Sequence, residues 1–131
     1  MPHTIARRQW IAGVLASIGL ARADEKPKQL TVEEVEKALA NGNAFLLDVR
    51  EPRELEESGT IKGYVNIPLS QLASRLNEIP KDKMIVTLCQ RGVRAERAGE
   101  LLLKHGYKVA GACGIQDWKN KEKPVVYPKK K

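Results

Sequence analysis

The sequence predicts an α/β fold, in which helices cover both faces of a parallel β-sheet. Continuous apolar runs occur at residues 44–49 and 84–88, and each run is too short for a helix. Apolar residues at helical spacing occur at 32–40 and again from Ala95 onward. Alternation of strands with helices is typical of a parallel sheet, and uninterrupted apolar strands are typical of a sheet buried on both faces.

The first 23 residues do not fit this pattern. Arg7 and Arg8 precede an apolar run at 10–20, and Ala21 and Ala23 complete an Ala-x-Ala cleavage signal. This order is typical of a secretory signal peptide, and a membrane-spanning helix needs about 20 apolar residues. We therefore predict cleavage near Ala23 and a periplasmic location without stable membrane insertion, by the general secretory or the twin-arginine route. An amphipathic helix or an uncleaved anchor is the alternative.

The rest of the chain has the length of one ordinary domain. We expect a signal peptide at 1–23, a polar linker at 24–28, the domain at 29–121 and a basic tail at 122–131. A capping box beginning at Thr31 predicts a helix over 32–40. The other expected elements are short and lie between glycine and proline residues: helical turns within 51–57, a strand at 64–67, a helix capped by Ser70 and ended before Pro80, a strand at 107–111 and a helix at 114–119 carrying Trp118 in the core.

The positive charge does not indicate a nucleic-acid partner. The formal net charge is +7, and three of the arginines lie in the expected signal peptide, which has no acidic residue. Aromatic residues make up 5% of the chain and do not interleave with the basic ones. The lysines at 129–131 are interpreted as a solvated end, and a monomer is expected.

The residues with the clearest chemistry follow the second apolar run, at 89–94. Cys89 stands after a strand and before a helix, at the edge where open α/β sheets bind ligands. Arg91, Arg94 and the N–H groups at the helix start favour a thiolate, and Gly92 lets the backbone turn several N–H groups toward one anion. The loop therefore predicts a nucleophilic cysteine in a cradle for small oxyanions or sulfur species. A buried structural cysteine is the alternative.

The segment Cys-Gln-Arg-Gly-Val-Arg at 89–94 resembles the six-residue active-site loop of the rhodaneses, the sulfurtransferase family. Three further segments resemble rhodanese motifs in the family's order: a strand and turn at 47–54, a Gly-His-Ile-x-Gly-Ala-x-Asn-Ile-Pro-like segment at 59–68 and a Gly-Gly-x-x-x-Trp-like segment at 113–118. Thr60, Ala95 and Cys113 depart from the family's usual histidine, serine and glycine. The resemblance implies one rhodanese-like domain with a sheet of about five parallel strands.

The resemblance also implies a reaction. The Cys89 thiolate would take the outer sulfur of thiosulfate or a polysulfide, and cyanide or a thiol would then accept it from the Cys89 persulfide. Gln90, Arg91, Gly92, Val93 and Arg94 would bind the donor, and no cofactor is implied. A periplasmic persulfide or polysulfide carrier, or a redox-sensing module, is the alternative.

A phosphatase or an arsenate reductase fits less well. Those enzymes place five residues between the cysteine and the arginine, whereas four residues separate Cys89 from Arg94.

Charged residues outside the loop have structural interpretations. Asp48, Arg50 and Glu54 predict a buried or half-buried ion pair that pins the loop after the first strand, and Asp48 and Arg50 are kept as secondary candidates near the site. His105 is expected at the far end of the helix after Cys89, too distant for a cysteine–histidine dyad.

Two cysteines in an exported protein suggest a disulfide. Cys113 is expected to end the strand beside the catalytic one, so a labile Cys89–Cys113 bridge is one hypothesis and a small apolar filler is the other. The spacing of Cys89, His105 and Cys113 does not match the paired ligands of zinc, so no metal site is expected.

Overall fold

The computed structural model describes residues 26–129. The expected signal peptide and the first two residues of the linker, 24 and 25, lie outside the described residues. Within the described range, no helix has both the length and the apolar character needed to cross a membrane.

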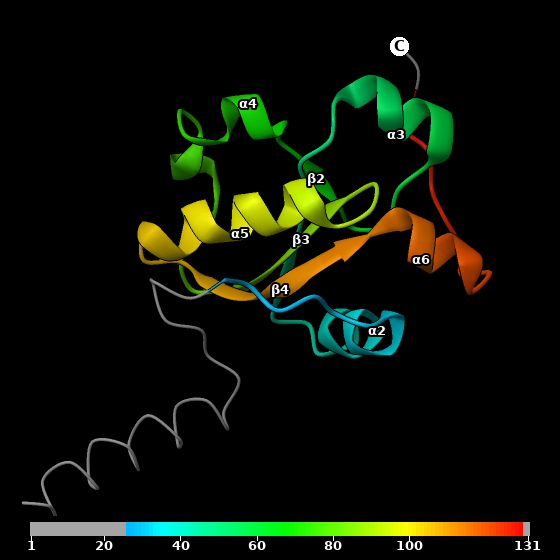
Figure 1. The fold of residues 1–131 in the computed structure, drawn as a ribbon, viewed down its shortest axis with the longest axis horizontal. Helices are drawn as coiled ribbons and strands as arrows, with labels where there is room; N and C mark the ends of the chain where they lie inside the picture. The colour runs from blue at the N-terminus through cyan, green and yellow to red at the C-terminus, as the bar shows by residue number, and fades with distance from the viewer. Residues whose placement is uncertain (1–25, 130–131) are drawn as a thin grey trace, which may run out of the picture.

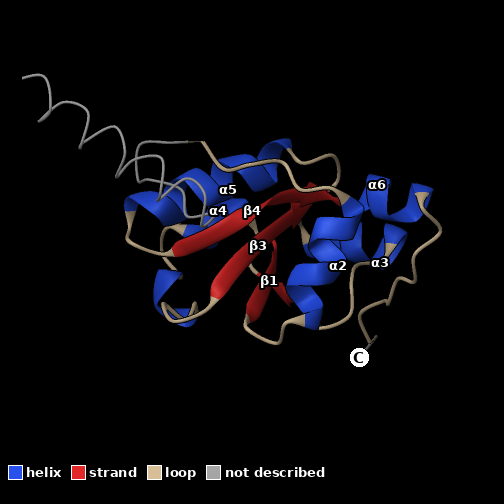
Figure 2. Ribbon diagram, turned by 90° about the horizontal axis from the view of Figure 1, so that it is seen from below, coloured by secondary structure: helices blue, strands red, loops and turns tan. Residues whose placement is uncertain are grey.

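A parallel sheet of four strands forms the centre of the domain (Figures 1 and 2). The spatial order is β2 (Val65–Asn66), β1 (Ala44–Asp48), β3 (Met84–Cys89) and β4 (Lys108–Gly114), and every pairing is parallel. The predicted α/β sheet is therefore confirmed, with one strand fewer than the expected number of about five.

The fifth position is occupied by a single bridge on the outer edge of β4. Gln29 pairs in parallel with Ala112, the Leu30 N–H donates to the Ala112 carbonyl at 2.7 Å, and the Ala112 N–H donates to the Lys28 carbonyl at 2.8 Å. Pro27 has no N–H before this bridge, and Thr31 caps a helix directly after it. Too few residues therefore remain at this edge to form a strand.

Helices cover both faces of the sheet. In chain order they are α2 (Val32–Ala40), α3 (Pro52–Ser58), α4 (Leu69–Leu72), the 3-10 turn η1 (Leu76–Glu78), α5 (Val93–Lys104) and α6 (Ile115–Asn120). Figure 1 shows α5 and α2 on opposite sides of the sheet. One core cluster joins α4 and α5 to Leu47 and Ile85, and the other joins α2 and α6 to Leu46 and Val86.

Local chemistry explains which helix predictions hold. The capping box of Thr31 and Glu34 is present, and α2 has the predicted bounds. The expected helix capped by Ser70 is wrong, because α4 begins after Pro68 and lasts one turn. The Ser74 hydroxyl donates to the Gln71 carbonyl at 2.9 Å, a local contact that competes with helix continuation.

The chain after α6 returns to the domain. The Thr60 and Val126 backbones exchange two hydrogen bonds of 2.8 Å in an antiparallel bridge. Trp118 is buried, as predicted, and its indole N–H donates to the Pro124 carbonyl at 2.8 Å. This segment therefore covers part of the core although it contains no helix or strand.

Candidate active site

The loop between β3 and α5 forms the site. Gly92 has a φ of +102°, in the left-handed region that favours glycine, and stands at the start of α5. Its N–H donates to the Cys89 sulfur at 2.9 Å. The helix begins two residues earlier than expected, so its first turn starts directly beside the cysteine.

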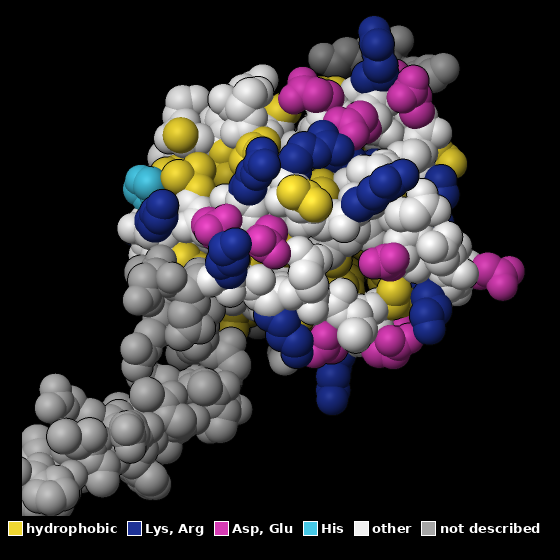
Figure 3. All heavy atoms as spheres, in the orientation of Figure 1, with side chains coloured by type: hydrophobic (Ala, Val, Ile, Leu, Met, Phe, Trp, Pro, Cys, Tyr) yellow, Lys and Arg dark blue, Asp and Glu magenta, His cyan; other side chains and the backbone are white. Residues whose placement is uncertain are grey.

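An open pocket of about 210 Å³ lies over the cysteine. It is lined by Cys89, Gln90, Arg91, Val93 and Arg94, so the structure brings the predicted loop residues together, with Gly92 contributing its N–H group. Figure 3 shows basic side chains around a small hydrophobic area over the start of α5. Cys89 itself is 1% exposed, at the floor of the pocket.

Two residues outside the loop, Gly114 and Gln29, lie against its backbone. A Cβ on Gly114 would lie 2.8 Å from the Gln90 carbonyl oxygen, so the end of β4 passes the loop too closely for any side chain. Gln29 donates to the Gly92 carbonyl at 3.2 Å and to the Glu96 carboxylate at 3.1 Å. Sequence reasoning missed Gln29, because a glutamine before a helix cap has no distinctive pattern.

Arg94 lies between the pocket and α3, where it meets Glu54. Its Nη1 and Nη2 donate to the two carboxylate oxygens of Glu54, each at 2.8 Å. This contact with the Arg94 guanidinium lowers the pKa of Glu54 to about 2, and the pKa of Arg94 is raised by the same hydrogen bonds. The expectation that Glu54 joins Asp48 and Arg50 in one ion pair is wrong, because α3 turns its carboxylate toward α5.

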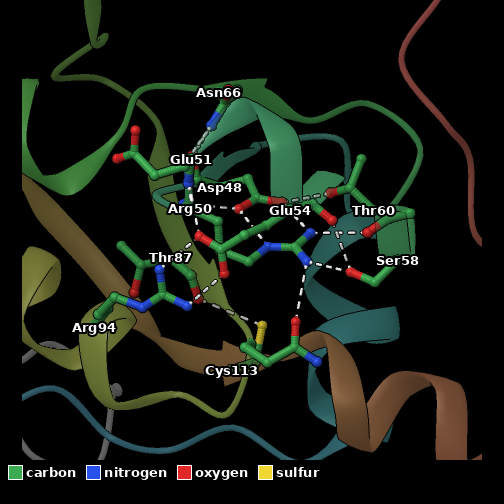
Figure 4. A network of polar contacts seen from close by, with 12 residues as sticks. Asp48, Arg50, Glu51, Glu54, Ser58, Thr60, Asn66, Thr87, Arg94 and Cys113 are labelled. Atoms are coloured by element: carbon green, nitrogen blue, oxygen red, sulfur yellow. Dashed lines mark hydrogen bonds and ion pairs between the residues drawn. The ribbon is translucent and has the colours of Figure 1, made fainter. Parts of the chain in front are cut away.

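Asp48 and Arg50 form the buried ion pair that the sequence predicts (Figure 4). Arg50 Nε and Nη2 donate to the Asp48 carboxylate at 3.0 and 2.7 Å, and both side chains are fully buried. The Thr60 hydroxyl donates to the same carboxylate at 2.7 Å. Arg50 Nη1 also donates to Ser58 at 2.8 Å and reaches Gln90 Oε1 at 3.4 Å. The pair therefore anchors the end of β1 and contacts the Cys89 loop through Gln90.

The two cysteines lie on opposite faces of the sheet. Leu88 pairs with Cys113 and Cys89 pairs with Gly114, and successive side chains of a strand point to opposite faces. Cys89 belongs to the core cluster under α5, whereas Cys113 belongs to the cluster under α2. Both thiols are free. This geometry contradicts the bridge hypothesis and fits the interpretation of Cys113 as an apolar filler.

Burial raises the pKa of the Cys113 thiol to about 12, with a smaller contribution from Cys89. The Cys113 sulfur contacts the Thr87 carbonyl at 3.4 Å, inside the core.

His105 lies at the carboxyl end of α5, exposed, with Nδ1 at 2.9 Å from the Leu101 carbonyl. Among residues 26–129, no group of three histidine, cysteine or acidic side chains is placed to hold a metal ion.

These features define the class of protein. It is a small α/β domain with a cysteine in a loop at the carboxyl edge of a parallel sheet, where N–H groups and arginines surround the thiol. The family is shown by comparison with known proteins. Residues 31–121 match the rhodanese-like domain, and the chain belongs to the rhodanese family.

Similar proteins include an uncharacterized protein, YqhL, of Bacillus subtilis, which is 45% identical over 100 residues, or 73% of this chain and 75% of that one. The human thiosulfate:glutathione sulfurtransferase is 37% identical over 109 residues, or 71% of this chain and 94% of that one. The crystal structure of a rhodanese-related protein from Thermoplasma volcanium matches with a TM-score of 0.69 at 31% identity, over 76% of this chain and 97% of that one.

Proposed function

We propose that this protein transfers sulfane sulfur from thiosulfate or a related donor to cyanide or a thiol, through a persulfide on Cys89. The observation that carries the proposal is the Cys89 sulfur, which accepts the Gly92 N–H at 2.9 Å on the floor of an open pocket. Family membership and the human relative named as a sulfurtransferase support sulfur transfer in general.

The reaction has two steps. The Cys89 thiolate attacks the outer sulfur of thiosulfate, the S–S bond breaks, and sulfite leaves with the electron pair. Cyanide then attacks the outer sulfur of the persulfide and leaves as thiocyanate, which returns the thiolate. The Gly92 N–H and the start of α5 would stabilise the negative sulfur in both forms.

The donor would be held by the rim of the pocket. Arg91 is exposed there and supplies a positive charge. Arg94 has five N–H groups, of which Glu54 engages two, so the others remain for hydrogen bonds to a sulfonate. Gln90 and Val93 complete the lining.

A carrier function is the second candidate. Val93 is 63% exposed beside the pocket, and an exposed apolar residue at this place would suit contact with an acceptor protein. In that case the Cys89 persulfide would be delivered to one partner quickly and to cyanide slowly.

We also propose that the protein is located in the periplasm. The basic start, the apolar run and the Ala-x-Ala signal of the first 23 residues support export to the periplasm, where the protein would act as a monomer.

Intact-mass measurement of residues 24–131 after brief exposure to thiosulfate tests the chemistry. The expected result is a gain of one sulfur atom that cyanide removes. Cys89→Ser should gain none, and Cys113→Ala should gain it as the wild type does. Sulfur on Cys89→Ser, or none on the wild type, would overturn the proposal.

A further inference from the structure

Two arginines line the pocket over Cys89, but the net charge of the side chains around the pocket is smaller than +2. Arg94 forms two parallel hydrogen bonds of 2.8 Å with the Glu54 carboxylate, the geometry of the strongest arginine–carboxylate contacts. The two side chains are 36% and 28% exposed, so water screens them only in part. Arg94 lines the pocket, and its charge is neutralised by Glu54 from α3.

Arg91 is the other cation of the lining. Its side chain is exposed, and no ion pair of Arg91 is present in the part of the chain that the structure describes. A ligand above Cys89 therefore meets one uncompensated arginine, the neutral Arg94–Glu54 pair and the N–H groups of the loop.

We propose that Glu54 is a specificity-determining residue, which favours singly charged persulfides over doubly charged thiosulfate as sulfur donors. This inference rests on the proposed function and narrows its substrate class. The Glu54 carboxylate neutralises the positive charge of Arg94, which would otherwise attract a second anionic oxygen of the ligand. Because Coulomb energy scales with the charge of the ligand, this compensation costs a dianion about twice what it costs a monoanion.

The preference should persist across the working pH range. Hydrogen bonds from Arg94 lower the pKa of Glu54 to about 2, so its carboxylate stays charged at neutral and mildly acidic pH.

The persulfide reaction balances without an oxidant. The Cys89 thiolate attacks the outer sulfur of the donor persulfide, whose S–S bond breaks. The donor's thiolate leaves with the electron pair and takes a proton from water, which yields a free thiol and the Cys89 persulfide.

Glu54→Gln removes the charge while keeping the size of the side chain and one oxygen for Arg94. The first measurement uses sulfate, an unreactive dianion, as a protecting ligand against alkylation of Cys89 by iodoacetamide. We expect Glu54→Gln to bind sulfate about tenfold more tightly, the size of one partly screened charge contact. Glu54→Asp, which keeps the charge, should bind sulfate as the wild type does.

The second measurement is kcat/KM with thiosulfate and with 2-hydroxyethyl persulfide, a donor whose only charge is that of its persulfide group. In Glu54→Gln the ratio of thiosulfate to persulfide should rise about tenfold, mainly through KM for thiosulfate. Glu56→Gln removes the same charge from an exposed position of α3 and should leave the ratio unchanged.

The outcomes separate the two proposals. Unchanged or weaker sulfate binding in Glu54→Gln, or an equal change in Glu54→Asp, would overturn the specificity role. Tighter sulfate binding without sulfur transfer by any variant, the wild type included, would support the charge effect at the pocket and overturn the sulfurtransferase function.

Discussion

Gly114 shows how the absence of a side chain allows the close approach of β4 to the Cys89 loop. A Cβ at this position would lie 2.8 Å from the Gln90 carbonyl oxygen and 2.8 Å from the Arg91 carbonyl carbon, and backbone atoms cannot turn aside as a side chain can. We expect Gly114→Ala to displace the loop and to lower the free energy of unfolding by about 1–3 kcal/mol. The rate of sulfur transfer should fall at least tenfold, because a barrier raised by roughly the same energy slows the reaction by about that factor. Urea unfolding and the cyanide assay measure both. Cys113→Ala, the adjacent change on the other face, is the control. Full activity in Gly114→Ala would contradict this account of the loop.

The two thiols should differ in reactivity by their surroundings. Both thiols are buried, but Cys89 lies at the floor of an open pocket, whereas Cys113 lies in the core under α2 and its pKa is raised to about 12. Iodoacetamide at pH 8 should label Cys89 alone in the folded protein, and both cysteines only after unfolding, as peptide masses would show. A folded chain two hydrogens lighter than the reduced one would instead indicate a disulfide.

The contact between Glu54 and Arg94 should make the stability of the fold depend on pH. Arg94 lowers the pKa of Glu54 from 4.5 to about 2 in the folded state, so the contact stabilises the fold fully above pH 4.5. That stability is lost as the pH falls from 4.5 toward 2. Because the pair is about one-third exposed, we expect about 1–2 kcal/mol rather than the full value of the shift.

Urea unfolding of the wild type and Glu54→Gln at pH 6 and pH 3 tests this contribution. The stability gap between the two proteins should be largest at pH 6 and shrink at pH 3. A gap of the same size at both values would show that the carboxylate's charge does not stabilise the α3–α5 contact.

Elements built from local signals were predictable from the sequence. The helix α2 follows from the capping box at Thr31, and β3 follows from its apolar run. The break after α4 was not predictable from apolar spacing, since it depends on a serine hydroxyl that bonds the backbone. The pairing of Glu54 with Arg94 was missed for another reason: it joins residues 40 positions apart, and only the tertiary fold brings the two side chains within reach.

At the scale of the whole molecule, the loop chemistry depends on a scaffold whose two core clusters lie on opposite faces of one sheet. The buried Asp48–Arg50 pair lies at the end of β1 and reaches Gln90, so it links the scaffold to the loop. Gln29, near the amino-terminal end of the described chain, holds the same loop from its other side through the Gly92 carbonyl. The segment at 26–30 therefore contacts the Cys89 loop, and we expect any processing of the chain to leave it intact.

This requirement leads to a prediction about export. Cleavage after Ala23 would leave the bridge between Gln29 and Ala112 and the loop contact of Gln29 in place. When the full chain is produced in a Gram-negative host, we expect the periplasmic fraction to contain a chain beginning at Asp24, as intact mass would show. Replacing both Arg7 and Arg8 by lysine should block processing if the twin-arginine route is used, and should leave it unchanged for the general secretory route, which needs only positive charge. An unprocessed chain confined to the cytoplasm would contradict export by either route.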